Sequence, residues 1–258
     1  MRSVSVHGTI SACAGSFIHQ SWGLSTGRCT ANRVNLMIRA GMVNINRPRL
    51  YFETNSYYTA PEFIDEIQPI TQPHDIALIR FNRVVNFNEF IQPVRIMPSV
   101  DMNRNYAAVT MTTAGWGTTW TLGEPSDDLN WVHLTGITNF VCLLLINQSF
   151  FIRDSTICAL PYNVTSQGIC SGDSGVPLTI VDDDGQITQV GVGSFASQFG
   201  CHAGFPSVFV RPGHYHDWMR EVTGINFDWS RSAVSEDVEE PFKIEETPTD
   251  ELKILRLD

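Results

Sequence analysis

Short apolar or alternating runs, separated by Gly, Pro, Asn and Asp, make up most of residues 1–210. The clearest runs are 34–39, 76–81, 109–113, 131–137, 176–181 and 189–195. Runs of this length broken by turn residues are typical of an all-β sandwich or barrel. A 3.6-residue period is found only at 213–222, which predicts one short helix near the end of the β-rich part. We therefore expect an all-β chain whose last regular element is a helix.

Polar segments divide this pattern into parts. The stretch 97–106 carries Pro98 and predicts a connector between two β-rich halves. Asp182-Asp-Asp-Gly185 predicts a hairpin turn; it is too short a ligand pattern for a calcium loop. Residues 230–258 are rich in Glu, Asp, Thr and Pro, and we expect them to be disordered or helical only on binding.

The net charge of −10 is unevenly distributed, since residues 230–258 hold nine acidic and four basic side chains and so contribute −5. A nucleic-acid partner would require a basic surface, so we expect none. No apolar run is long enough to cross a bilayer, so we expect no membrane partner.

Six cysteines occur without Cys-x-x-Cys spacing: Cys13, Cys29, Cys142, Cys158, Cys170 and Cys201. An even number in this arrangement favours disulfides over zinc, and disulfides indicate an oxidising compartment. Glycosylation sequons at Asn147 and Asn163 are consistent with secretion. Met1 is not followed by a signal-peptide pattern, and the chain opens directly into strand-like sequence. We expect a secreted protein whose first segment is truncated.

The stretch around Gly172-Asp-Ser-Gly175 is the strongest candidate for chemistry. Glycines on both sides allow a tight turn that presents Ser174 and lets backbone N–H groups point into one cavity. A serine hydroxyl becomes a nucleophile only with a nearby base and with donors for the oxyanion. For the tetrapeptide alone, a turn without catalytic function is an equally good interpretation.

Three further motifs precede this one in the chain: Cys13-Ala-Gly-Ser-Phe17, Asp75-Ile-Ala-Leu-Ile-Arg80 and Thr113-Ala-Gly-Trp-Gly117. With them the chain resembles the chymotrypsin/trypsin (S1) serine proteases from about residue 4 to residue 222. It is most similar to the arthropod chymotrypsin-like and brachyurin (collagenase-like) branch. The resemblance implies two six-stranded antiparallel β-barrels with an active site in the cleft between them. It divides the chain into a first barrel at 1–98, a second barrel with the C-terminal helix at 99–229, and the acidic tail at 230–258.

Site residues follow from the same resemblance. Ser174 matches the nucleophile, Asp75 matches the aspartate that orients the base, and the amides of Gly172 and Ser174 match the oxyanion hole. Gly168 matches the floor of the specificity pocket, and its remaining positions are Ala196, Ser207, Ser194 and Phe195. A neutral pocket of this kind implies apolar or aromatic specificity, unless it is vestigial. The implied disulfides are Cys13–Cys29, Cys142–Cys158 and Cys170–Cys201, with no metal and no cofactor.

The position of the base departs from the family. The segment that should end in His-Cys reads Trp22-Gly-Leu-Ser-Thr-Gly-Arg28-Cys29. An arginine guanidinium remains protonated at physiological pH and cannot take the proton of Ser174. His74 adjoins Asp75, but strand neighbours point to opposite faces, and His19 is too far from this position. We expect Arg28 to fill the place of the imidazole and to form an ion pair with a buried Asp75, which would be costly without a cation.

Two more departures concern the oxyanion loop. Val176 replaces the second glycine of the family motif, where its β-branched side chain either crowds the cleft or is tolerated. Asp173 matches the carboxylate that pairs with a freed amino terminus in active members. Met1 lies downstream of that terminus, so we expect Asp173 to be unpaired and the oxyanion hole to be imperfectly formed.

These features predict a catalytically silent serine protease homologue, a monomer that binds proteins or peptides in the cleft between the barrels. One alternative is an active secreted chymotrypsin-like or collagenase-like endopeptidase with apolar specificity, in which Arg28 is compensated by another group or is an error in the sequence. Another is a structural or interaction protein that works through residues 230–258.

Overall fold

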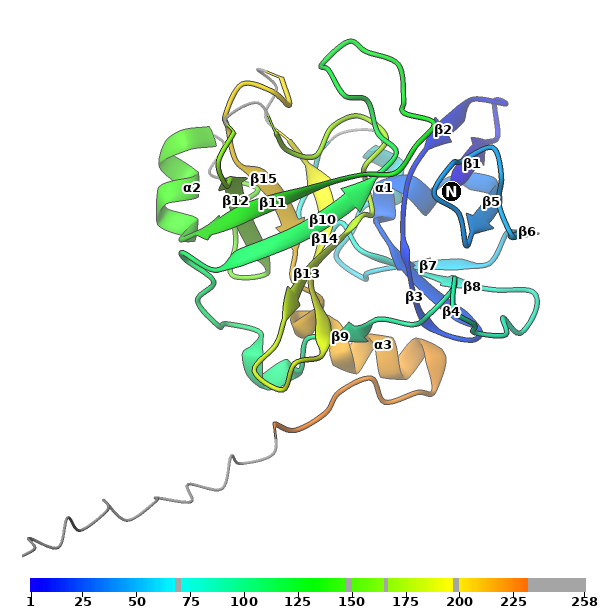
Figure 1. The fold of residues 1–258 in the computed structure, drawn as a ribbon. Helices are drawn as coiled ribbons and strands as arrows, with labels where there is room; N and C mark the ends of the chain where they lie inside the picture. Colours follow the sequence, from blue (N-terminus) through cyan, green and yellow to red (C-terminus); the bar gives the residue numbers. More distant parts are fainter. Residues whose placement is uncertain (68–70, 147–149, 165–166, 197–199, 232–258) are drawn as a thin grey trace, which may run out of the picture.

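Strands dominate the computed structural model, which describes residues 1–67, 71–146, 150–164, 167–196 and 200–231 (Figure 1). The strands are β1 (Arg2–Ser5), β2 (Ile10–Ala12), β3 (Ser16–His19), β4 (Trp22–Ser25), β5 (Arg33–Ala40), β6 (Leu50–Thr54), β7 (Tyr57–Thr59), β8 (Ala77–Arg80), β9 (Arg95–Ile96), β10 (Thr110–Gly115), β11 (Asn130–Ile137), β12 (Thr156–Pro161), β13 (Pro177–Val181), β14 (Ile187–Phe195) and β15 (Ser207–Val210). The helices are α1 (Gly27–Thr30), α2 (Asn139–Ile146) and α3 (His216–Thr223), with 3-10 turns η1 (Asp65–Ile67), η2 (Ser99–Asp101) and η3 (Pro212–Tyr215).

The second half of the chain forms a closed barrel. Its strands follow the order β13-β10-β11-β12-β15-β14, and β13 pairs with β14 to close the cylinder. The short strand β9 joins β14 from outside in a parallel pair. In the first half, two antiparallel sheets have the orders β2-β1-β5-β6 and β3-β4-β8-β7. The all-β two-part architecture expected from the sequence is confirmed, whereas the domain boundaries at 98 and 229 stay predictions.

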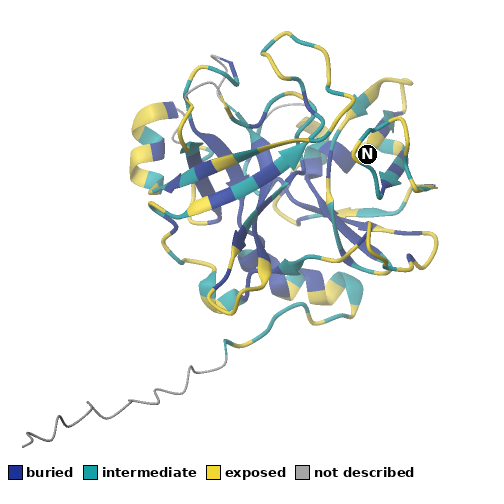
Figure 2. Ribbon diagram, viewed as in Figure 1, coloured by how far each residue is buried: buried dark blue, intermediate teal, exposed yellow. Residues whose placement is uncertain are grey.

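The core shows why these runs form strands. In β5 the buried side chains alternate with exposed or half-buried ones, as a strand with one face on a core requires. One continuous apolar cluster contains Leu24 and Leu78 from the first half and Met111, Leu178 and Phe209 from the barrel. Figure 2 shows this buried interior where the two halves meet. The site described below lies at this seam, so its geometry depends on both halves.

Two helices illustrate what periodicity can and cannot reveal. Helix α3 coincides with the expected helix, and Gly224 ends it with a left-handed φ of 72°. Helix α2 was not expected, because its sequence Asn-Phe-Val-Cys-Leu-Leu-Leu-Ile is apolar on every side and shows no 3.6-residue period. Cys142 and Ile146 anchor it, since both are buried against Cys158 and Val208.

Three disulfides join the pairs implied by the family resemblance, Cys13–Cys29, Cys142–Cys158 and Cys170–Cys201. The turn at Asp182–Gly185 connects β13 to β14 as expected. The disorder expected for the acidic tail concerns residues 232–258, which lie outside the described residues, as does the sequon residue Asn147. Within the described ranges no helix is long and apolar enough to span a membrane.

Candidate active site

The turn that carries Ser174 is held between the two halves of the molecule. Gly172 and Gly175 adopt left-handed φ values of 95° and 92°. A Cβ atom on Gly175 would lie 2.1 Å from the carbonyl oxygen of Ala14, so glycine is required there for space as well as for conformation. The Ala14 N–H donates to the carbonyl oxygen of Ser174 over 2.7 Å. The turn is therefore fixed against Ala14, which precedes β3, and against the Cys13–Cys29 disulfide.

Asp75 is fully buried just before β8 and accepts three hydrogen bonds. The backbone N–H of Arg28 donates to Oδ1 over 2.8 Å, and Arg28 Nε donates to Oδ2 over 2.9 Å. The hydroxyl of Ser194 also donates to Oδ2, over 2.6 Å. Sequence reasoning assigned Ser194 to the specificity pocket and missed this bond, because nothing in the sequence pairs positions 75 and 194.

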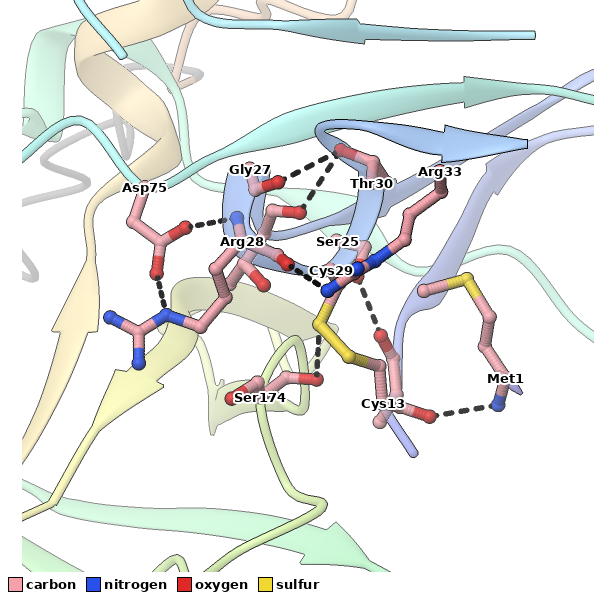
Figure 3. The surroundings of a disulfide bond; sticks show 12 residues. Met1, Cys13, Ser25, Gly27, Arg28, Cys29, Thr30, Arg33, Asp75 and Ser174 are labelled. Carbon is pink, nitrogen blue, oxygen red and sulfur yellow. Dashed lines mark hydrogen bonds and ion pairs between the residues drawn. A yellow bond between two sulfur atoms is a disulfide. The ribbon is translucent and has the colours of Figure 1, made fainter. Parts of the chain in front are cut away.

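Arg28 occupies α1, directly before Cys29, as the sequence led us to expect (Figure 3). Its ion pair with Asp75 is the expected one: Nε lies 2.9 Å from Oδ2, and the Arg28 side chain is 19% exposed. This geometry uses a single N–H of the guanidinium. A protonated guanidinium donates hydrogen bonds but cannot accept the proton that Ser174 must lose to become a nucleophile.

The described histidines form no hydrogen bond with this pair. His74 has a left-handed φ of 59°, and its Nδ1 lies 3.0 Å from the hydroxyl of Tyr215. Burial lowers the pKa of His74. His19 accepts a hydrogen bond from the Ser21 N–H through Nδ1. Within the described residues, no histidine hydrogen-bonds to Asp75 or Ser174, so no imidazole stands in for the missing base.

His133, His202, His214 and His216 each have a partner elsewhere, at Thr112, Thr121, the Met102 carbonyl and the Met97 carbonyl respectively. His7 lies in the exposed turn after β1.

Asp173 accepts two backbone hydrogen bonds that the sequence did not reveal. Oδ1 accepts the Gly117 N–H over 2.8 Å and Oδ2 accepts the Cys170 N–H over 3.0 Å. Burial raises the pKa of Asp173, while these two bonds lower it, and the net shift is upward. No cation pairs with Asp173 among the described residues, and the Met1 amino group instead donates to the Cys13 carbonyl over 2.8 Å.

Val176 points away from the cleft. It is 1% exposed, and its methyl groups lie 2.9 and 2.7 Å from where Cβ atoms on Gly115 and Gly193 would be. Of the two alternatives, the structure favours tolerance. Val176 and Asp173 both line a cavity of about 290 Å³ that Ser174 does not line.

A larger cavity of about 540 Å³ is lined by Ser174 and forms the cleft. Arg28 and Ser174 line it together with three of the expected specificity positions, Ser194, Phe195 and Ala196. Gly168 borders the smaller cavity instead, and a Cβ atom there would lie 3.1 Å from the hydroxyl of Ser207. The two remaining pocket positions are therefore neighbours, and their role in specificity stays a prediction.

The proposed oxyanion amides are available. Neither the Gly172 N–H nor the Ser174 N–H donates to another group in the described part of the chain. In the same described residues, no group of three or more His, Cys, Asp and Glu side chains is placed to hold a metal.

Comparisons with known proteins agree with this geometry. The trypsin family model matches residues 1–219. Trypsin 5G1 of Aedes aegypti is 29% identical over 225 residues, covering 86% of this chain and 79% of that protein. A collagenase of Hypoderma lineatum is 29% identical over 217 residues, covering 83% and 77%. A solved structure of HL collagenase superposes with a TM-score of 0.75 at 25% identity, covering 87% of this chain and 91% of that one.

The chain belongs to the trypsin family of serine proteases. Its relatives include a collagenase in sequence and in structure, which confirms the resemblance to the collagenase-like branch.

Proposed function

We propose that this chain is a serine protease homologue that is catalytically impaired and acts by binding proteins or peptides in its cleft. One observation carries the proposal: a guanidinium bonded to Asp75 stands where the family needs a neutral imidazole. Loss of a triad member leaves only about 10³–10⁴-fold acceleration over water, which is far below the rate of a working protease.

The preserved parts of the site support a binding role. Asp75 keeps three hydrogen bonds, the amides of Gly172 and Ser174 are not used by other described groups, and the cleft stays open. The three disulfides and the membership in the trypsin family both favour an extracellular location. A scaffold that keeps its cleft but lacks a base can hold a polypeptide without cutting it.

Turnover of chromogenic peptides with apolar residues before the scissile bond tests this proposal. The wild-type chain should release no product above a Ser174→Ala control, whereas Arg28→His should release product that Ser174→Ala abolishes. Wild-type turnover within about a hundredfold of an ordinary chymotrypsin-like enzyme, lost in Ser174→Ala, would refute it. The alternative function, an active endopeptidase with apolar specificity, predicts wild-type turnover that is lost in Ser174→Ala.

A further inference from the structure

The guanidinium of Arg28 is only partly used by the protein. It offers five N–H donors, and Asp75 takes the one on Nε. Its Nη2 atom is buried and has no hydrogen-bond acceptor among the described residues. Buried charged donors are normally satisfied, so the guanidinium still has hydrogen-bonding capacity that the protein does not use. The Arg28 side chain as a whole is 19% exposed and lines the cavity of about 540 Å³, so an acceptor from outside can reach the exposed part of the guanidinium.

The exposed part of the Arg28 side chain belongs to the wall of the cleft. Arg28 is the only charged side chain among the described residues that line the cavity of about 540 Å³. The carboxylate of Asp75 lies behind Arg28 and is fully buried, so it does not line the cavity. Among the described lining residues, a ligand that enters therefore meets a single positive charge and no negative one.

Other donors lie close to the cation. Ser174 lines the same cavity, and its hydroxyl has no hydrogen-bond partner in the described part of the chain. The amide of Ser174 is likewise not used by the protein. A cation, a hydroxyl and a free amide together favour an anion, and a planar carboxylate fits the fork of a guanidinium particularly well.

The rest of the lining indicates what kind of carboxylate fits. Ile169, Phe151, Phe195 and Ala196 make much of the wall apolar. At a free chain end, the carboxylate and the last side chain leave the same Cα atom, so one residue can satisfy both the cation and the apolar wall. An internal Asp or Glu places its carboxylate on the side chain and would leave the apolar wall unfilled.

We propose that the cleft recognises the free C-terminal carboxylate of a polypeptide that ends in an apolar residue, with Arg28 as the group that binds the carboxylate. This inference rests on the proposed function and gives it a ligand class. Replacement of the base by arginine would then convert a site that cuts chains into one that holds chain ends.

Fluorescence anisotropy with three labelled octapeptides tests the inference. One ends in Phe as a free acid, one is the same peptide as a C-terminal amide, and one carries an internal Glu and an amidated end. The wild-type chain should bind the free acid at least 10-fold more tightly than either of the others. Equal affinity for acid and amide would overturn the inference, and tight binding of the internal Glu peptide would overturn its assignment to chain ends.

Variants separate the role of Arg28 from that of the fold. Arg28→Gln combined with Asp75→Asn removes the cation without leaving a buried charge unpaired, and it should abolish the preference for the free acid. The matched control is Arg220→Gln with Asp217→Asn, which removes an exposed Arg–Asp pair on α3 and should keep the preference. A preference that survives in the first double variant would overturn the role of Arg28.

Should the first double variant not fold, as judged by its thermal transition, Arg28→Lys takes its place. A lysine keeps the charge but loses the fork, so the preference should fall at least threefold. An unchanged preference would count against Arg28. Binding is measured by anisotropy and turnover by release of the chromogenic product, so the two results are scored separately. Cleavage of chromogenic substrates would refute the proposed function, whereas equal binding of acid and amide refutes this inference alone.

Discussion

Arg28 holds Asp75 at two points: its backbone N–H reaches Oδ1 over 2.8 Å, and its Nε reaches Oδ2 over 2.9 Å. The first bond needs only the position of α1 and would be made by any residue there except proline, which has no backbone N–H. The second is specific to the side chain and neutralises a carboxylate that is fully buried. Arginine therefore suits this position physically, whereas an apolar residue would leave the buried Asp75 carboxylate without a cation.

Replacing Arg28 with Gln should destabilise the protein strongly. Removal of one partner from a buried ion pair costs about 3–5 kcal/mol, because the remaining charge has lost its compensation. Chemical denaturation should show this loss for the single variant and a much smaller one when Asp75→Asn is added. A single variant as stable as the wild type would mean that the ion pair does not stabilise the fold.

Ser194→Ala should cost less, about 1–3 kcal/mol, because Asp75 keeps two of its three donors. The suitable control is Ser126→Ala, since that hydroxyl bonds to the Asp128 carbonyl at the surface. Denaturation midpoints compare the two variants. Equal effects would show that the bond from Ser194 to Asp75 contributes nothing beyond an ordinary surface contact.

Gly117→Ala should disturb the Ser174 turn. A Cβ atom there would lie 2.5 Å from the carboxylate of Asp173, and overpacking of this kind costs about 1–3 kcal/mol. Gly185→Ala is the control, since it has open space and only the strain of a φ of 76°. We expect Gly117→Ala to lower both stability and peptide affinity, and Gly185→Ala to leave affinity unchanged. Unchanged affinity in both variants would contradict this coupling.

Acid should release the segment that follows α3. Trp229 donates through Nε1 to the Ile96 carbonyl over 2.8 Å, and Arg231 pairs with Asp182 over 2.9 Å. The hydrogen bond from Arg95 lowers the pKa of Asp184 to about 2. Burial acts to raise the pKa of Asp182, but hydrogen bonds led by that from Arg231 outweigh it and lower that pKa.

Both carboxyls thus have a lower pKa in the folded state than in the unfolded chain. Their contribution to stability is present above the unfolded value of about 4 and is lost as the pH falls toward 2. Subtracting the emission spectrum of Trp229→Phe from that of the wild type isolates the emission of Trp229. This emission should shift to the red as the pH falls across this range. Arg231→Gln should bring the shift to higher pH, and no shift in either protein would refute the arrangement.

Sequence reasoning identified the strands because the alternation of buried and exposed positions is a local property, as β5 shows. It located Ser174, Asp75 and Arg28 because each is embedded in a distinctive motif. It missed the bond from Ser194 to Asp75 and the two amides that hold Asp173, since these join residues far apart in the chain. Helix α2 was missed for a different reason: an apolar run without a period does not distinguish a helix from a buried strand.

The seam that fixes Ser174 has an evolutionary consequence. The contacts of Ala14 with Ser174 and Gly175, and the Cys13–Cys29 disulfide, hold the turn without any part of the Arg28 side chain. Selection on the scaffold is thereby separated from selection on the chemistry. A lineage can lose or regain a base at position 28 through one replacement that still donates to Asp75, while the ancestral frame around it is inherited unchanged.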